Sequence, residues 1–422
     1  MRSRTALAAL AAAAVPSMTS PIHAQHADDS KADVALVGGT VHVAPGEAAI
    51  PDGVVVVRDG AIAAVGDRSS VAVPPDMATL DCSGLAVTAG FWNSHVHFFE
   101  RKWADAESIP GPELRRQLEE TFTRFGFTSV FDTGSPWANT RRLRDRVESG
   151  EVRGPRIRST GEALIAPGAM PGERILAALG FMTFPAPEIT DAGQASAAAR
   201  RLLEEGVDGL KIHLQPPPPP GSPFPEDAIA PVVDEARRAG KPVFVHPNTA
   251  SDVRTAVRAG VDVVAHTTPR SGPWDEATLA AMRERGVALI PTLTLWSEAL
   301  RHDRASAREA LAATAVGQLR AWRAAGGTVL FGTDAGAVDP DPTAEYAAMA
   351  VAGMSFGEIL ASLTTAPAER LGDAGQTGRL VPGQAADLVV LERDPAQDVR
   401  ALASVRYTLR RGRVICRRQA ER

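Results

Sequence analysis

Two histidines separated by one residue, His95 and His97, end an apolar run in the stretch GFWNSHVHF, residues 90–98. Alternate residues of a β-strand point to the same face of a sheet, so both imidazoles can reach the same space at a strand end. Imidazole nitrogen is a common ligand of zinc and of similar divalent ions. The spacing alone is a weak signal, because most such pairs are surface or core histidines, so the surrounding pattern decides its meaning.

Other side chains able to bind a metal follow other β-rich segments. Lys211 lies in VDGLKIHL, His246 ends VFVH, His266 ends DVVAH and Asp334 lies in LFGTDAG. Four of the nine histidines thus fall at predicted strand ends. Histidines with separate structural roles would be scattered over helices and loops, and several buried polar groups would lack partners at a cost in free energy. The pattern therefore favours one shared site.

The elements that must position these residues alternate between β-rich and helical segments over residues 85–372. The expected strands are 87–97, 128–133, 156–161, 209–214, 243–246, 262–267, 288–295 and 328–334. Eight strands alternating with helices predict an α/β fold, a (β/α)8 TIM-like barrel whose chemistry lies at the carboxyl ends of the strands. A doubly wound parallel sheet is the alternative, but it usually carries a glycine-rich phosphate loop after its first strand, and NSHVHFFE is not one.

Both ends of the mature chain read as short strands punctuated by turns. Residues 33–84 and 376–418 are rich in valine and isoleucine, and RDGAI contains the Asp-Gly turn of a tight hairpin. We expect one small β-sandwich domain formed by both termini. The two cysteines, Cys82 and Cys416, lie one in each part. They are either paired in a disulfide or two separate buried thiols.

Residues 1–24 have the pattern of a secretory signal peptide. Arg2 and Arg4 precede the apolar stretch Ala6–Val15, and small residues lead to a cleavable bond after Ala24. We expect an exported protein, periplasmic or secreted. The apolar stretch is too short for a stable membrane anchor, so no membrane association is expected after the signal peptide is removed.

The composition is ordinary for a soluble globular protein, and the partner that we expect for the shared site is a small-molecule substrate. The 422 residues carry a formal net charge of −5 and contain no long basic run, which argues against nucleic acid as a partner. The residues leave the oligomeric state open, a homo-oligomer included.

Taken together, the order of these residues resembles the amidohydrolase superfamily. The stretches TAGFWNSHVH, GTDAG, TTAPAERLG and RLVPGQAADLVVL are similar to those of its imidazolonepropionase-like, cytosine-deaminase-like and prolidase-like members, over nearly the whole mature chain. The resemblance implies two divalent metal ions, with Zn²⁺ expected: His95, His97 and Asp334 would hold one ion, and His246 and His266 the other. It also implies that Lys211 is carboxylated on N6 and bridges the two ions. The alternative is an ordinary lysine paired with an acid or with a substrate carboxylate, beside one metal.

The resemblance further implies a hydrolase with a metal-activated hydroxide. Asp334 would take a proton from the water and return it to the leaving nitrogen of an amide, cyclic amide or peptide. A phosphotriesterase or lactonase would use the same site, and a barrel that binds a metal or ligand without turnover is a third possibility.

The substrate is less well defined. His213 should share the face of Lys211, where it either orients substrate or forms part of the wall, and Arg270, Trp274 and Trp296 are candidate substrate contacts on the loops. Arg270 would bind a carboxylate or be solvated. In prolidase-like members the histidine of strand five is followed by Ala-Tyr, whereas His246 is followed by Pro-Asn. Deaminase-like members have a glutamate nearby that is absent here, and imidazolonepropionase lacks the lysine, so none of these substrates is assigned.

Overall fold

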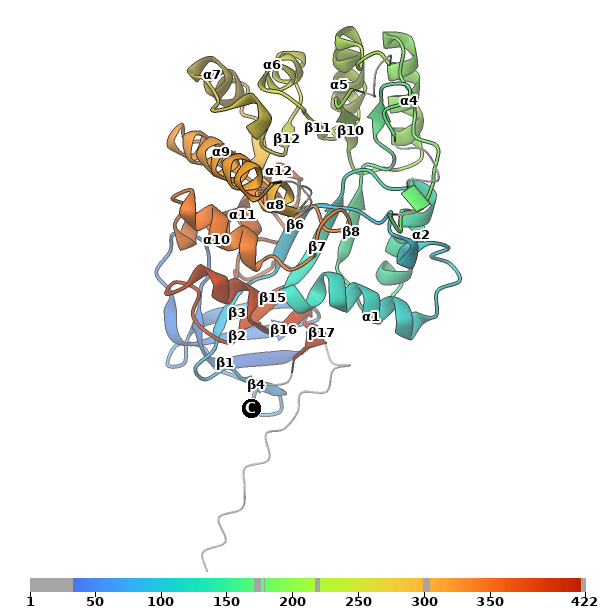
Figure 1. The fold of residues 1–422 in the computed structure, drawn as a ribbon. Coiled ribbons are helices and arrows are strands. Elements are labelled where there is room, and N and C mark those ends of the chain that lie inside the picture. The colour runs from blue at the N-terminus through green and yellow to red at the C-terminus, as the bar shows by residue number, and fades with distance from the viewer. Residues whose placement is uncertain (1–32, 171–175, 178, 217–220, 299–303, 419–422) are drawn as a thin grey trace, which may run out of the picture.

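The computed structural model describes residues 33–170, 176–177, 179–216, 221–298 and 304–418 of the chain. The predicted signal peptide, residues 1–24, lies outside these ranges. Two regions are apparent in Figure 1: a sheet at one end of the molecule, which carries the blue and red strands, and a larger α/β region above it.

The first region is one eight-stranded sheet built from both ends of the chain. Strand β5 joins the two parts, because it pairs in parallel with β1 and antiparallel with β15. The strands are β1 (Val34–Val41), β2 (Ile50–Arg58), β3 (Ala61–Asp67), β4 (Thr79–Asp81), β5 (Ala86–Ala89), β15 (Leu388–Leu391), β16 (Val405–Arg410) and β17 (Arg413–Arg417). Strands from both ends of the chain thus share one sheet, and the sandwich domain expected from the sequence stays a prediction.

Two tight hairpins show the expected turn chemistry. Asp59 and Gly60 connect β2 to β3 with φ values of 49° and 76°. Arg411 and Gly412 connect β16 to β17 with φ values of 48° and 73°. Two successive residues with positive φ form the turn that matches the right-handed twist of paired strands, and glycine adopts this conformation without steric cost.

The two cysteines are free and buried, so the disulfide pairing considered above is wrong and the alternative of separate thiols is confirmed. Cys82 packs into the apolar cluster that includes Leu36, Val55 and Val390. Cys416 lies on β17, where its Sγ is 3.6 Å from Glu119 Oε1. Strands β15 and β16 separate β17 from the strands beside Cys82, and at about 4.8 Å per strand the sulfurs are beyond the reach of a disulfide.

The second region contains two parallel sheets. The three-stranded sheet consists of β6 (Phe91–Val96), β7 (Phe127–Asp132) and β8 (Arg156–Ser159). The six-stranded sheet consists of β9 (Leu164–Ile165), β10 (Leu210–His213), β11 (Val243–His246), β12 (Val263–Ala265), β13 (Ala288–Ile290) and β14 (Thr328–Val329). The α/β class with parallel strands is therefore as predicted, with one short strand, β9, that the sequence pattern did not indicate.

The first predicted strand is divided in two at Gly90. Residues before it form β5 in the terminal sheet, and residues after it form β6, the first strand of the parallel region. A Cβ atom at Gly90 would lie 2.3 Å from Thr128 Oγ1, so only glycine fits where the chain crosses between the two regions.

Backbone hydrogen bonds link the first parallel strand to the segment after the last. Ser94 N donates to Phe331 O at 2.7 Å, Asp334 N to His95 O at 2.9 Å, and His97 N to Ala335 O at 2.8 Å. These bonds place the ends of β6 and of the β14 segment side by side, although they are more than 230 residues apart in sequence.

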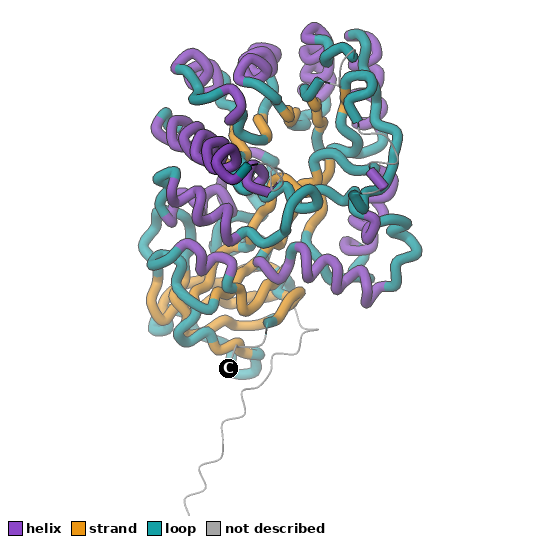
Figure 2. The backbone as a smooth tube through the Cα atoms, in the orientation of Figure 1, coloured by secondary structure: helices purple, strands orange, loops and turns teal. Residues whose placement is uncertain are grey.

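Helices lie outside the parallel strands, as Figure 2 shows in purple around the orange strands. They are α1 (Gly111–Thr121), α2 (Trp137–Glu148), α4 (Ala192–Glu204), α5 (Ile229–Arg238), α6 (Ala250–Ala259), α7 (Glu276–Glu284), α8 (Leu295–Glu298), α9 (Ala305–Ala324), α10 (Thr343–Val351), α11 (Phe356–Leu363) and α12 (Thr365–Arg370). Short 3₁₀ turns are η1 (Arg101–Trp103), η2 (Thr123–Phe125), η3 (Glu226–Ala228), η4 (Pro269–Ser271) and η5 (Val399–Ala403). None of the helices in the described part of the chain is both long and apolar enough to cross a membrane.

Inward-facing side chains of the parallel strands form a separate apolar cluster. It contains Trp92 from β6, Phe131 from β7, Phe244 from β11 and Ile290 from β13. Phe244 and His246 are two residues apart on β11 and so point to the same side of the sheet. The apolar cluster therefore lies beneath the polar residues at the strand ends.

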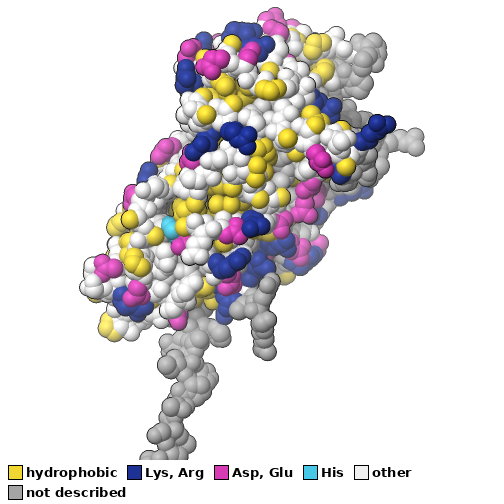
Figure 3. Space-filling view, turned by 60° about the vertical axis from the view of Figure 1, so that its left-hand side comes forward, with side chains coloured by type: hydrophobic (Ala, Val, Ile, Leu, Met, Phe, Trp, Pro, Cys, Tyr) yellow, Lys and Arg dark blue, Asp and Glu magenta, His cyan; other side chains and the backbone are white. Residues whose placement is uncertain are grey.

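On the face shown in Figure 3, basic and acidic side chains are interspersed with hydrophobic ones, without a broad area of a single charge.

Candidate active site

All of the predicted metal ligands lie at the carboxyl ends of the parallel strands. His95 is on β6, Lys211 on β10 and His246 at the end of β11. His266 follows β12 directly, and Asp334 lies in the segment after β14. These residues, with His97 and His213, line one cavity of about 300 Å³. The structure thus brings together side chains that the sequence spreads over some 240 residues.

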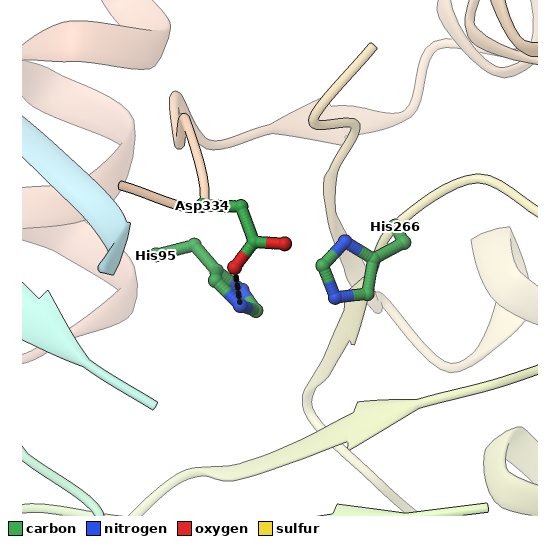
Figure 4. A group of neighbouring side chains, drawn as sticks. All are labelled: His95, His266 and Asp334. Carbon is green, nitrogen blue, oxygen red and sulfur yellow. Dashed lines mark ion pairs between the residues drawn. The ribbon is translucent and has the colours of Figure 1, made fainter. Parts of the chain in front are cut away.

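Asp334 is the centre of the cluster. Its Oδ1 lies 3.3 Å from His95 Nε2 and 3.0 Å from His97 Nε2. Figure 4 shows the carboxylate between the imidazole rings of His95 and His266. One ligand atom from each of these three residues falls within 4.8 Å of the others, the spacing of a metal-ion site.

The other imidazoles continue from this cluster in a row. The rings of His95 and His266 are 4.6 Å apart between centroids, and those of His266 and His246 are 4.4 Å apart. His213 stacks on His246 at 4.1 Å. His266 is therefore in contact with both predicted ligand groups, and the division of ligands between two ions stays a prediction.

Two of the candidate ligands have unusual backbone conformations. The φ of His266 is 74° and that of Asp334 is 66°, in the left-handed region that residues other than glycine seldom adopt. The three predicted strands that end at 267, 295 and 334 accordingly stop earlier in the structure. Such strain persists only where the surroundings impose it, and it is concentrated at functional sites.

Burial makes most of the nitrogen atoms in the site neutral. It lowers the pKa of His95 and of His213 to about 3. It also lowers the pKa of Lys211 to about 7, against the attraction of Asp334 and Asp132. For Asp334, burial raises the pKa, but His95, His97 and His266 outweigh it and hold the pKa well below its ordinary value. A neutral imidazole or amine has a free electron pair to offer an electrophile.

Several buried polar atoms of the site have no protein partner. Lys211 is 2 % exposed, yet its Nζ makes no hydrogen bond to any described residue, and the same holds for Nδ1 of His95. Buried polar atoms are rarely left unsatisfied. Imidazole nitrogen and carboxylate oxygen around a shared space suit a divalent cation, so the residues present fit a metal centre.

The candidate substrate residues are distributed differently. His213 lines the cavity. Trp274 is buried and its Nε1 donates to Thr268 Oγ1 at 2.8 Å, whereas Trp296 Nε1 donates to Thr267 Oγ1 at 2.9 Å. Neither tryptophan nor the exposed Arg270 is among the described residues that line the cavity. Their part in substrate binding stays a prediction.

Two features of the site were missed in the sequence. Asp132 ends β7 and its Oδ1 is 3.9 Å from His97 Nδ1, a position that the strand-end pattern in VFDTG could have indicated. The second feature is an apolar wall that includes Phe99 and Phe181. Its residues come from two loops, and no sequence pattern brings these loops together.

The fold places a cluster of side chains that could hold a metal ion at the carboxyl ends of parallel strands, an arrangement that fits a hydrolase. The model of the amidohydrolase family matches residues 86–415, and the chain belongs to that family and is an amidohydrolase enzyme. The family generally uses a divalent metal centre.

Individual relatives agree with this assignment. The chain is 23% identical to an ochratoxinase of Aspergillus niger over 420 residues, covering 90% of this chain and 85% of the relative. It is 30% identical over 350 residues to an uncharacterized protein of Mycobacterium tuberculosis, covering 78% and 84%. Among solved structures, a Xaa-Pro dipeptidase with methionine bound in its active site is similar with a TM-score of 0.76 at 22% identity, covering 90% of this chain and 99% of that one. At this level of identity the comparison supports a likeness of fold alone. Structures of this family imply a TIM barrel.

Proposed function

We propose that this chain is an exported, metal-dependent amidohydrolase that cleaves a C–N bond in a small-molecule amide, cyclic amide or peptide. The observation that carries the proposal is the convergence of His95, His266 and Asp334 at ligand distances in a buried cavity. The hydrolytic activities in the names of its relatives, ochratoxinase and Xaa-Pro dipeptidase, support the same class of reaction.

The proposal includes the finer architecture. We take the parallel strands to close into a (β/α)8 barrel, which the bonds from β6 to residues 331–335 support. The terminal sheet would fold on itself as a sandwich, supported by the bonds of Ile62 N to Gln384 O and of Ala386 N to Gly60 O. The boundaries are the ones expected from the sequence, with a barrel over 85–372 and the sandwich over 33–84 and 376–418.

The metal centre would be held by His95, His97, His246, His266 and Asp334, with Zn²⁺ as the expected ion. When bound, a divalent ion lowers the pKa of a water ligand and polarises a carbonyl group. Lys211 would be carboxylated: its neutral amine adds to the carbon of CO₂, so that an N–C bond forms, one C–O π bond breaks to leave a carboxylate, and the nitrogen releases a proton. Its complete burial and its unpartnered Nζ support this role.

The chain's own residues would perform the proton transfers. Asp334 would accept a proton from water at a carboxylate oxygen and donate it to the departing nitrogen. The histidines beside it, 3.3 Å and 3.0 Å away, hold its carboxylate in position. The apolar cluster of Trp92 and Phe244 beneath the cavity excludes water from that side. The Asp334 carboxylate would thus be oriented in a site with little water, where its electrostatic interactions are stronger than in bulk solvent.

The experiment that tests the metal centre is elemental analysis of purified mature protein. About two ions per chain in the wild type and fewer in Lys211→Ala are expected. Lys241→Ala is a matched control, because Lys241 precedes β11 at the opposite end of the strands and should not change metal content. One ion in both wild type and Lys211→Ala would make Lys211 a bystander, and no ion after reconstitution would overturn the proposal.

The reaction is tested with a panel of amides beside an aryl phosphotriester and a lactone. Amide hydrolysis that is lost in Asp334→Asn supports the proposal, and activity that survives this substitution contradicts the role of Asp334. Export is tested by sequencing the amino terminus of the protein from the periplasm or medium. A mature chain beginning at Gln25 is expected, and an uncleaved chain in the cytoplasm would contradict export.

A further inference from the structure

The cavity has two chemically different halves. One half is the cluster of histidines with Lys211 and Asp334. The other half is an apolar wall, defined here as the side chains Phe99, Ile165, Met170, Phe181, Met182 and Phe184. This wall has no role in the proton transfers and requires its own explanation.

The apolar wall begins directly at the reactive end of the cavity. Phe99 stacks on the imidazole of His97 with ring centroids 4.6 Å apart and an interplanar angle of 23°. Phe181 meets Phe99 edge-on at 4.8 Å. A substrate whose reacting carbon lies beside the histidines therefore has these two rings next to it.

Main-chain hydrogen bonds hold the wall in place on both sides. Met182 N donates to Phe99 O at 2.7 Å, and Arg101 N donates to Gly180 O at 2.9 Å. On the other side, Ile165 N donates to Pro187 O at 3.0 Å. These bonds join the segments that carry the wall through main-chain atoms, so they do not depend on the side chains that face the cavity.

The charges of the cavity are confined to its reactive end. Within the described part of the chain, Lys211 is the one lysine or arginine that lines it, and Lys211 is 2 % exposed beside the histidines. Against the described residues of the wall, a substrate carboxylate would lose its water without gaining a cation, which is unfavourable. An aromatic or branched aliphatic group there would be removed from water and would be stabilised by contact with the rings.

We propose that the substrate carries a neutral aromatic or branched aliphatic group next to the scissile C–N bond, and no carboxylate there. This inference rests on the proposed function, and it specifies the substrate class of the same site. It differs from a dipeptide with a free carboxylate, and from a role for Arg270 as a carboxylate ligand. The volume of about 300 Å³ is at the lower end for small-molecule sites, which also favours a compact group.

Binding is measured first, by calorimetry on the metal-loaded mature protein, with two amides of equal shape. The two compounds differ at one end only: 4-methylpentanamide carries an isopropyl group where succinamate carries a carboxylate. We expect 4-methylpentanamide to bind at least about tenfold more tightly. Equal or tighter binding of succinamate, or binding of neither, would overturn the inference.

The wall is tested by substitution at Phe181. Phe181→Ala is expected to weaken binding of 4-methylpentanamide about tenfold and to leave succinamate unchanged, whereas Phe181→Leu should retain most of the affinity. Leu179→Ala is the matched control, since Leu179 belongs to the same segment but is 58 % exposed and does not line the cavity. Unchanged affinity in Phe181→Ala would contradict the role of the wall.

Turnover separates this inference from the proposed function. Two matched pairs place the varied group on either side of the scissile bond: 4-methylpentanoyl and succinyl 4-nitroanilide, and N-isobutylbenzamide and hippurate. Hydrolysis with preference for the neutral members supports both proposals. Hydrolysis with preference for an anionic member overturns the inference and leaves the amidohydrolase function standing. If the neutral members bind tightly but no member is hydrolysed, the result counts against the amidohydrolase function. It still supports the inference that the apolar wall binds a neutral group.

Discussion

Asp132 Oδ1 lies 3.9 Å from His97 Nδ1, on the opposite side of the imidazole from Asp334, which is 3.0 Å from His97 Nε2. Both carboxylates are buried. Ser135 and Ser159 donate hydrogen bonds to Asp132 and hold it in place, although burial raises its pKa to about 6. His97 therefore lies between Asp334 of the proposed metal centre and Asp132 behind it, an arrangement that would orient the imidazole for metal binding.

We expect Asp132→Asn to weaken metal binding by about 10- to 100-fold, because the negative charge behind His97 is lost while the side chain keeps its shape. Competition with a chelator of known affinity measures this change. Asp262→Asn is the control, since Asp262 accepts a hydrogen bond from Val243 N at the start of β11, away from the cavity. Equal metal affinity in wild type and Asp132→Asn would show that Asp132 serves the fold alone.

Thr292 contacts His266, a second proposed metal ligand. Its Oγ1 is 2.6 Å from His266 Nδ1, and its φ of 42° shows that its own conformation is constrained. Thr292→Val keeps the branched shape but removes the hydroxyl, so we expect about tenfold weaker metal binding, with Thr292→Ser close to wild type. The comparison uses the same chelator titration. A loss in the serine variant equal to that in the valine variant would point to packing instead of the hydrogen bond.

The segment carrying Thr292 is held in turn by Glu345 on α10. Its carboxylate accepts hydrogen bonds from Leu293 N and Thr294 N, both at 2.8 Å, and burial raises its pKa from 4.5 to about 7. A carboxyl group with a raised folded-state pKa stabilises the protein fully below pH 4.5. That contribution is lost as the pH rises to about 7, because the unfolded chain ionises first.

Between pH 4.5 and 7 this loss amounts to about 3 kcal/mol at most. Glu345→Gln cannot ionise, so the difference in free energy of unfolding between wild type and variant should change by about that amount over this interval, in the direction that favours wild type at low pH. Urea unfolding at several pH values measures it. The exposed Glu309→Gln on α9 should show no such trend, and a flat difference for Glu345→Gln would contradict the prediction.

Gly90, where the chain passes from β5 to β6, leaves no room for a larger side chain beside Thr128. We expect Gly90→Ala to lower the free energy of unfolding by roughly 1–3 kcal/mol, since the new Cβ would overlap Thr128. The double variant Gly90→Ala with Thr128→Ala should recover part of the loss, because Thr128 supplies the nearest atoms. Gly317→Ala has the opposite expected sign, a gain of about 0.5–1 kcal/mol, because Gly317 lies in helix α9 with open space around it. Additive effects at Gly90 and Thr128 would count against a direct clash.

The local pattern of the sequence was sufficient for much of the fold. Alternating β-rich and helical segments predicted the parallel region, and the Asp-Gly turn predicted a hairpin that the structure contains at Asp59 and Gly60. The strand ends were less accurate, since His266, Thr292 and Asp334 adopt positive φ values that no propensity indicates. These conformations are imposed by tertiary contacts, among them the bond between His266 and Thr292.

The sequence by itself determined which residues could form the site. Residues at the carboxyl ends of parallel strands all lie at the same edge of a sheet, so their side chains come together there. His95, Lys211, His246, His266 and Asp334 were found in this way, and Asp132 obeys the same rule. Only the tertiary structure decided what surrounds them. Phe99 and Phe181 meet because main-chain hydrogen bonds join two loops far apart in sequence, and Cys82 and Cys416 remain apart because two strands lie between them. Such contacts depend on loop closure and on the order of strands in a sheet, which local sequence does not encode.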